Sequence, residues 1–135
     1  MYIAGLNTDR VHQYSLPSPW MVSGAVYDNR SALINQDTAP QEIVFRPDGL
    51  KMYMVGTTND RVYQYTLTGA RQVNTSSYDG VSLLVSSQDG TPNGLSFSPD
   101  GTRLYIVGAS NDRVYQYILT GARNVATALY NNVFT

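Results

Sequence analysis

The sequence predicts an all-β chain made of a repeated four-stranded antiparallel unit. Three observations support this prediction: a period of 51 to 52 residues, turn signals between short strand-like runs, and the absence of helical periodicity. The period is clearest in a segment that occurs three times, as Met1–Gly5, Met52–Gly56 and Leu104–Gly108. A second segment repeats with the same steps and begins at Asp9, Asp60 and Asp112.

Each unit is expected to begin with a short strand that ends at a tight turn. In the last copy this strand is predicted over Gly94–Ser98, followed by Pro99-Asp100-Gly101. Proline presets φ at the second position of such a turn, and glycine accepts the conformation at its end. The same signal, Pro47-Asp48-Gly49, occurs one repeat earlier, so both copies are expected to turn here.

The second and third strands of the unit are expected to form its centre. Leu104–Val107 is apolar on both faces, which is typical of a strand in a sheet that neighbouring sheets cover on both sides. Arg113–Leu119 follows the Asn111-Asp112 turn and alternates two kinds of side chain, so that one face carries aromatic residues. The fourth strand, expected over residues 78–86 in the middle copy, varies most between copies, as suits an outer edge.

Four strands per unit at this period predict β-propeller blades and exclude a solenoid of helical hairpins. The chain is therefore expected to be a single propeller segment over residues 1–135 with roughly three blades. Repeat 1 spans residues 1–51, repeat 2 spans 52–103, and a truncated repeat 3 spans 104–135.

Composition excludes several classes of partner. Charged residues make up 14% of the chain, the net charge is −1, and the charges are scattered, so a nucleic-acid partner is not expected. There are no cysteines, and no apolar run is long enough for membrane insertion. Because Met1–Gly5 enters a strand directly, no signal peptide is expected, and composition leaves the compartment open.

The segment Phe97–Tyr105, followed by Asn111–Tyr117, resembles the propeller repeats of phage and marine bacterial surface proteins. A strand that ends in Ser-Pro-Asp-Gly is also similar to lactonase-like and WD-type propeller repeats. Pro19-Trp20 resembles the linker of such repeats between the third and fourth strands, although Arg71 and Arg123 replace the tryptophan in the other copies. The resemblance implies a repeat scaffold of a virion or cell surface, and it implies no active-site residue.

Candidate catalytic and metal-binding groups align with the repeat. The single histidine, His12, takes the place of Tyr63 and Tyr115, and no second histidine or cysteine could complete a familiar metal site. The aspartates share turn positions, which predicts side-chain bonds to turn backbone; the alternative is a ring of carboxylates that binds calcium. The aligned sets are Asp9, Asp60 and Asp112; Asp48 and Asp100; Asp37 and Asp89. We expect no catalytic residue, metal or cofactor.

Tyrosine is abundant, with eleven residues, and nine of them fill three positions of the repeat: Tyr2, Tyr53 and Tyr105; Tyr14, Tyr65 and Tyr117; Tyr27, Tyr78 and Tyr130. Positions filled in every copy favour packing between blades over ligand binding. A ligand surface is expected instead among residues that differ from their repeat equivalents. These candidate ligand-binding residues are Trp20, His12, Arg30 and Arg46.

The sequence favours a non-enzymatic structural or recognition module that binds a glycan or a protein, in a virion or on a cell surface. The alternative is a hydrolase of the lactonase or sialidase type, which would need histidines, glutamates or arginines out of phase with the repeat. Glu42 is the only glutamate, and Arg10, Arg61 and Arg113 are in phase.

The chain is expected to begin and end inside a blade, which leaves apolar blade faces in water. Head-to-tail self-association into a closed ring would cover them, and a homodimer with six blades is favoured because closed rings typically have four to eight. The alternative is a fragment of a longer propeller. In the ring, Tyr105→Asp is expected to unfold the assembly, and Tyr130→Asp to be milder.

Overall fold

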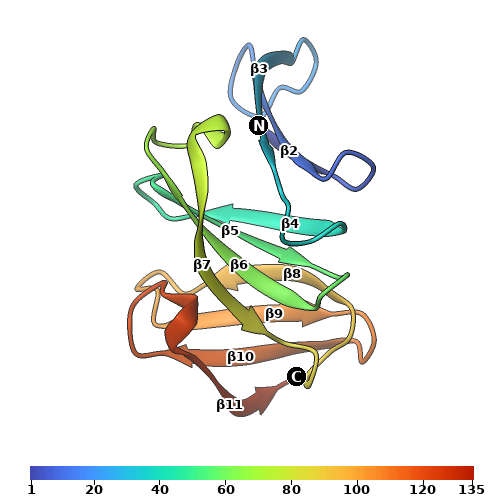
Figure 1. Ribbon diagram of the computed structural model, residues 1–135, viewed down its shortest axis with the longest axis vertical. Coiled ribbons are helices and arrows are strands. Elements are labelled where there is room, and N and C mark those ends of the chain that lie inside the picture. The colour runs from blue at the N-terminus through green and yellow to red at the C-terminus, as the bar shows by residue number, and fades with distance from the viewer.

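The computed structural model describes all 135 residues and contains three antiparallel sheets that follow one another along the chain (Figure 1). The N-terminal sheet has three strands, β1 (Tyr2–Gly5), β2 (Arg10–Ser15) and β3 (Val26–Leu33). The middle sheet has four, β4 (Pro40–Phe45), β5 (Lys51–Gly56), β6 (Arg61–Leu67) and β7 (Ser76–Leu84). The C-terminal sheet has four, β8 (Pro92–Phe97), β9 (Arg103–Gly108), β10 (Arg113–Leu119) and β11 (Ala128–Phe134). Short 3₁₀ turns, η1 (Val73–Thr75) and η2 (Val125–Thr127), precede β7 and β11.

The all-β class and the antiparallel strands are confirmed, and the strand order within each sheet follows the sequence. Strand β10 has the expected bounds, whereas β7 begins and ends two residues before the expected range. In the last unit, which the sequence predicts to be truncated, β11 still pairs with β10 from Ala128 to Phe134. The short last copy therefore forms a complete four-stranded sheet.

The Pro-Asp-Gly turns require glycine at their last position. Gly49 and Gly101 both have φ of 75°, in the left-handed region that other residues rarely adopt. The Gly101 amide donates to the carbonyl oxygen of Ser98 at 2.9 Å, which closes the turn. A Cβ atom at Gly101 would lie 2.6 Å from Cγ of Arg123, so both the backbone conformation and the space favour glycine.

We expect Gly101→Ala to lower the free energy of unfolding by about 1–2 kcal/mol, because alanine is strained at positive φ. Gly90→Ala is the matched control, because its Cβ would meet only Ser110 Oγ, at 3.9 Å. Urea unfolding of the two variants measures the difference. Equal stability of the two would contradict this account of the turn.

Two hydrophobic cores hold the three sheets together, and β5 contributes to both. Met52 and Met54 face the N-terminal sheet, whereas Tyr53 and Val55 face the C-terminal sheet. All four side chains are at most 1% exposed. The prediction that the second strand of a unit is covered on both faces is therefore confirmed for β5.

For β9 the same prediction is wrong within a single chain. Leu104 and Ile106 are buried against the middle sheet, but Val107 on the other face is 47% exposed and Tyr105 is half-buried. The reason is that no sheet of this chain follows the C-terminal sheet (Figure 1). A charge at Tyr105 would therefore meet solvent in an isolated chain, and its expected effect on folding is small there.

The aspartates that precede the first strands of the middle and C-terminal sheets, Asp37 and Asp89, accept hydrogen bonds from turn backbone, as predicted. The Asp89 carboxylate accepts hydrogen bonds from the backbone N–H groups of Thr91, Ser110 and Asn111 at 2.8, 3.1 and 3.0 Å. Burial raises the pKa of Asp89, but these three donors outweigh it and hold the pKa below its ordinary value. In the preceding repeat, the Asp37 carboxylate likewise accepts from three backbone N–H groups.

The turn aspartates Asp9, Asp60 and Asp112 have another explanation, and the prediction of side-chain bonding is wrong for them. Their φ angles are 50°, 49° and 50°, and none of their side chains hydrogen-bonds the backbone. Aspartate tolerates this left-handed conformation better than most residues. The pKa of Asp60 is raised by burial and by the charges of Asp37 and Asp89.

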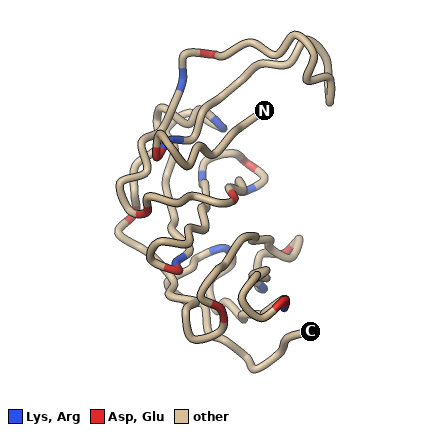
Figure 2. Tube along the Cα trace, turned by 90° about the vertical axis from the view of Figure 1, so that its right-hand side faces the viewer, with Lys and Arg blue, Asp and Glu red and all other residues tan.

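Acidic and basic residues are interspersed along the trace from Asp28 to Arg123, with no long run of one sign (Figure 2). Two ion pairs form, Arg46–Asp48 at 2.8 Å and Lys51–Asp79 at 2.6 Å. No group of three or more histidine, aspartate or glutamate side chains is arranged to hold a metal ion. None of the helical segments has the length and apolar character that crossing a bilayer requires.

Candidate functional site

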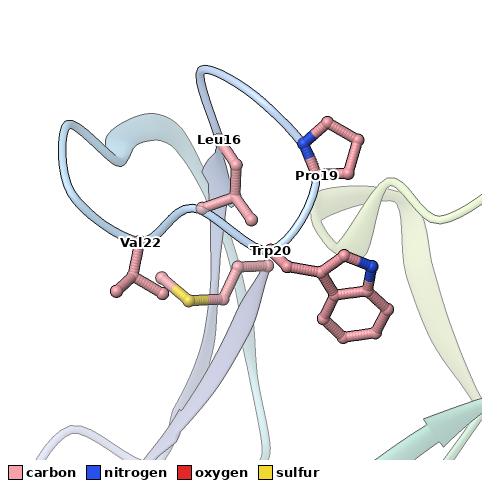
Figure 3. Close-up of a pocket in the computed structure, with 5 residues that line it drawn as sticks. Leu16, Pro19, Trp20 and Val22 are labelled. Carbon is pink, nitrogen blue, oxygen red and sulfur yellow. The ribbon is translucent and has the colours of Figure 1, made fainter.

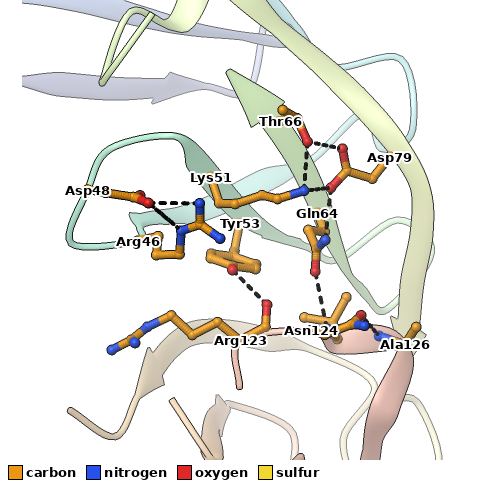
Figure 4. A network of polar contacts seen from close by, with 11 residues as sticks. Arg46, Asp48, Lys51, Tyr53, Gln64, Thr66, Asp79, Arg123, Asn124 and Ala126 are labelled. Atoms are coloured by element: carbon orange, nitrogen blue, oxygen red, sulfur yellow. Dashed lines mark hydrogen bonds and ion pairs between the residues drawn. The ribbon is translucent and has the colours of Figure 1, made fainter. Parts of the chain in front are cut away.

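Neighbouring sheets are joined by polar contacts that recur with the repeat. Between the middle and C-terminal sheets, the Tyr53 hydroxyl donates to the carbonyl oxygen of Arg123 at 2.7 Å (Figure 4). In the same interface, Oε1 of Gln64 accepts from the backbone N–H of Val125 at 3.2 Å. The Arg123 carbonyl and the Val125 N–H are both backbone groups of the segment that leads into β11.

The interface between the N-terminal and middle sheets has the same two contacts. The Tyr2 hydroxyl donates to the carbonyl oxygen of Arg71 at 2.9 Å, and Oε1 of Gln13 accepts from the backbone N–H of Val73 at 3.2 Å. Each sheet thus presents a tyrosine hydroxyl and a glutamine amide to the backbone of the next sheet. This pair of contacts defines one repeated interface.

The glutamine is held in place by an aspartate on the fourth strand. Nε2 of Gln64 donates to Asp79, which also accepts from Lys51 Nζ and from the Thr66 hydroxyl (Figure 4). Burial raises the pKa of Asp79, but hydrogen bonds from Lys51, Thr66 and Gln64 outweigh it and lower the pKa. Because Nε2 is fixed as a donor, Oε1 is left facing the next sheet as an acceptor.

An apolar hollow of about 520 Å³ lies at the outer end of the N-terminal sheet; we call it the head hollow (Figure 3). It is lined by Met1, Leu16, Pro19, Trp20 and Val22. Trp20 is 94% exposed and has φ of 65°, close to the 59° and 55° of its equivalents Arg71 and Arg123. Trp20 and its two equivalents therefore share a left-handed backbone conformation, but nothing of this chain covers Trp20.

A smaller hollow of about 180 Å³ lies at the opposite end, on the outer face of the C-terminal sheet; we call it the tail hollow. It is lined by Tyr105, Val114, Gln116, Val133, Phe134 and Thr135. The side chains of Tyr105 and Gln116, the equivalents of Tyr53 and Gln64, make no hydrogen bond in this chain. Asn131 stands where Asp79 stands in the middle sheet, and its buried Oδ1 has no partner.

The structure does not bring the four predicted ligand-binding residues into one site. Trp20 lines the head hollow, whereas the Nε2 atom of His12 on β2 lies 3.1 Å from the Thr8 hydroxyl. Arg30 is on β3 opposite Gln13, and Arg46 pairs with Asp48 after β4. Sequence reasoning missed the interface glutamines Gln13, Gln64 and Gln116, although their presence in all three copies was a signal.

The buried tyrosines make the fold sensitive to alkaline pH. Burial raises the pKa of Tyr53 to about 12 and also raises those of Tyr65 and Tyr117. Because the pKa of Tyr53 is higher in the folded chain than the ordinary value of 10.0, its neutral hydroxyl contributes stability that is fully present below pH 10. This stability is lost as the pH rises towards 12.

We therefore expect the free energy of unfolding to fall steadily between pH 10 and pH 12. Tyr53→Phe should lower stability at pH 8 by about 1 kcal/mol, because the Arg123 carbonyl loses its donor, and should flatten the alkaline decline. Denaturant titrations at pH 8, 10 and 11 measure both effects. A decline as steep in Tyr53→Phe as in the parent chain would contradict the assignment to Tyr53.

Comparison with known proteins shows the fold class. No protein-family model matches the chain, and no curated protein matches it. Among solved structures, it is similar to a putative 6-phosphogluconolactonase from Bacteroides fragilis, with a TM-score of 0.68, 13% identity, and coverage of 99% of this chain and 35% of that one. At this level of sequence identity the similarity shows the fold alone, which is that of a lactonase-like propeller.

Two further structures agree. A putative 6-phosphogluconolactonase from Bacteroides uniformis has a TM-score of 0.67 and 14% identity, over 96% of this chain and 36% of that one. A functionally unknown protein from Desulfotomaculum acetoxidans has a TM-score of 0.60 and 15% identity, over 90% of this chain and 34% of that one. The chain spans about a third of the length of these proteins.

Proposed function

We propose that the chain is a segment of roughly three propeller blades that acts as a non-enzymatic structural and recognition module and binds a protein surface through the head hollow. The observation that carries the proposal is the exposure of Trp20, at 94%, beside four further side chains that are mostly apolar. Exposed aromatic side chains in apolar surroundings are typical of protein interaction sites.

A protein ligand fits the head hollow better than a glycan does. Sugar hydroxyls need several hydrogen-bond partners, and binding sites for small polar ligands place polar side chains around an apolar floor. The head hollow is lined by four hydrophobic residues of five. Its free polar groups belong to the backbone of the loop that carries Trp20 and Val22, and backbone groups suit contact with another protein.

The side chains capable of acid–base chemistry also support a structural role. The carboxylates of Asp37 and Asp89 are each used by three backbone donors, and the only glutamate, Glu42, accepts from the backbone N–H of Leu95 at 2.6 Å. Each of these contacts stabilises a turn or joins two sheets. The resemblance to repeats of surface and virion proteins points the same way.

The second candidate function is lactone hydrolysis, which the names of two similar structures favour. The test is a hydrolysis screen with 6-phosphogluconolactone and related lactones, beside a glycan array. The non-enzymatic proposal would be overturned by turnover that is abolished when one residue differing from its repeat equivalents is replaced, as in His12→Ala. A glycan whose binding is lost in Trp20→Ala would overturn the choice of a protein ligand.

A further inference from the structure

The two end faces of the chain are the two halves of the interface that occurs twice inside it. On the C-terminal sheet, Tyr105 and Gln116 have the places that Tyr53 and Gln64 have in the middle sheet. On the N-terminal sheet, Trp20 and Val22 have the places that Arg71 and Val73 have there. Each end thus carries the groups that the other lacks.

We propose that a second copy of this chain docks its N-terminal sheet onto the C-terminal sheet of the first, head to tail, and that two such contacts close a homodimer of six sheets. The inference rests on the proposed function, because it names the protein that the head hollow binds. The tail hollow of one copy is then the surface that covers Trp20 of the other.

The polar groups of the two ends match in number and kind. By the pattern of both internal interfaces, the Tyr105 hydroxyl donates to the carbonyl oxygen of Trp20 in the second copy. Oε1 of Gln116 accepts from the backbone N–H of Val22 in the second copy. None of these four groups has a hydrogen-bond partner within one chain, and docking supplies all four.

The apolar groups of the head match as well. Met1, Leu16 and Val22 are exposed or half-buried at the head. Their repeat equivalents inside the chain, Met52, Leu67 and Val73, are at most 2% exposed. Docking would bring the head residues into the environment that their equivalents already have.

Apolar residues at the tail are likewise more exposed than their repeat equivalents inside the chain. Val107 is 47% exposed and Val114 is half-buried, whereas their equivalents Val55 and Val62 are completely buried. Transfer of these side chains out of water favours association, because burial of apolar surface is favourable.

At the proposed contact, Trp20 stands where the internal interfaces have an arginine beside a phenylalanine ring. At the internal interface the ring of Tyr2 packs on Phe45 of β4, with ring centroids 4.6 Å apart, and the Arg71 guanidinium lies 5.7 Å from the same ring. The N-terminal sheet has no strand to supply such a phenylalanine. An indole at the arginine position provides a flat apolar surface for the Tyr105 ring instead.

The chemistry of the ends favours a head-to-tail contact over a symmetric one. The tail offers side chains, a tyrosine hydroxyl and a glutamine amide, whereas the head offers a backbone carbonyl and a backbone N–H. Both internal interfaces pair these side chains with backbone groups of the next sheet, and only a head placed on a tail repeats that pairing. Heterologous contacts form a ring when the rotation between successive copies brings the last copy back to the first. Two copies give six sheets, within the four to eight blades typical of closed propellers, whereas three copies would give nine.

The decisive experiment measures mass by sedimentation equilibrium across a dilution series. The parent chain is expected at twice the 14.9 kDa of one copy, and Trp20 emission should shift to the blue as the dimer forms. Val22→Asp breaks the head, and Val107→Asp breaks the tail; each variant alone is expected to be a folded monomer by circular dichroism. Mixed together, they should form a one-to-one dimer through the intact head and intact tail.

The hydroxyl contact has its own matched pair of variants. Tyr105→Phe should raise the dimer dissociation constant about threefold to tenfold, the range expected for one hydrogen bond. Tyr130→Phe should leave it unchanged, because the Tyr130 ring packs inside the chain and its hydroxyl has no hydrogen bond.

Three outcomes would overturn the inference. A folded monomeric parent chain would show that the ends do not meet, and the non-enzymatic proposal would still stand if no lactone is turned over. A Val107→Asp variant that still forms a dimer would indicate head-to-head contact. Failure of the mixed variants to associate would also contradict docking of a head onto a tail.

Discussion

Val55→Asp is expected to leave the chain unfolded at neutral pH. Val55 is completely buried between the middle and C-terminal sheets, where no cationic side chain is part of its hydrophobic core. An unpaired carboxylate in such a place costs several kcal/mol, which is comparable with the whole stability of a small domain, about 5–15 kcal/mol. Far-UV circular dichroism and denaturant titration measure the loss.

Val107→Asp is the matched variant at the same position of the next repeat. Its side chain is 47% exposed on the outer face of the C-terminal sheet, so the new carboxylate stays hydrated. We expect a cooperative unfolding transition and a loss of about 1 kcal/mol or less in a dilute, monomeric sample. Equal damage from the two substitutions would mean that the two faces of a sheet are equivalent in the isolated chain, contrary to the structure.

Asp89→Ala is expected to lower the free energy of unfolding by about 3 kcal/mol or more. The change leaves three backbone N–H groups without an acceptor beneath the turn that joins β9 and β10, and each unsatisfied donor costs about 1–3 kcal/mol. Asp100→Ala is the control, because that carboxylate lies in an exposed turn, where water can replace it.

The pH dependence of stability gives a second readout for Asp89. Because its pKa is lowered in the folded chain, the stability that it contributes is present above the ordinary value of 3.8 and is lost as the pH falls below that value. The acid limb of the stability profile should therefore be flatter in Asp89→Ala. An unchanged acid limb would mean that protonation of Asp89 is not linked to unfolding.

Much of the candidate site could not be predicted from the sequence. Trp20 differs from the arginines at the same position of the other two copies, and the structure places it in the head hollow. His12, Arg30 and Arg46 also differ from their repeat equivalents, yet they do not gather in one site, because a difference between copies can reflect a changed contact of any kind. The glutamines cannot be recognised in this way, because a repeated polar residue on a strand does not reveal which face of the strand meets another sheet.

The repeat, the all-β class and the positions of the turns can be predicted from the sequence, because they depend on local chemistry. Proline and glycine at Pro99 and Gly101 impose their turn wherever the rest of the chain lies. Which copy of a repeated residue is buried follows from the packing of the sheets and cannot be predicted from the repeat. Val55 and Val107 occupy the same position of the repeat, and one is buried while the other is exposed, because burial depends on whether another sheet follows.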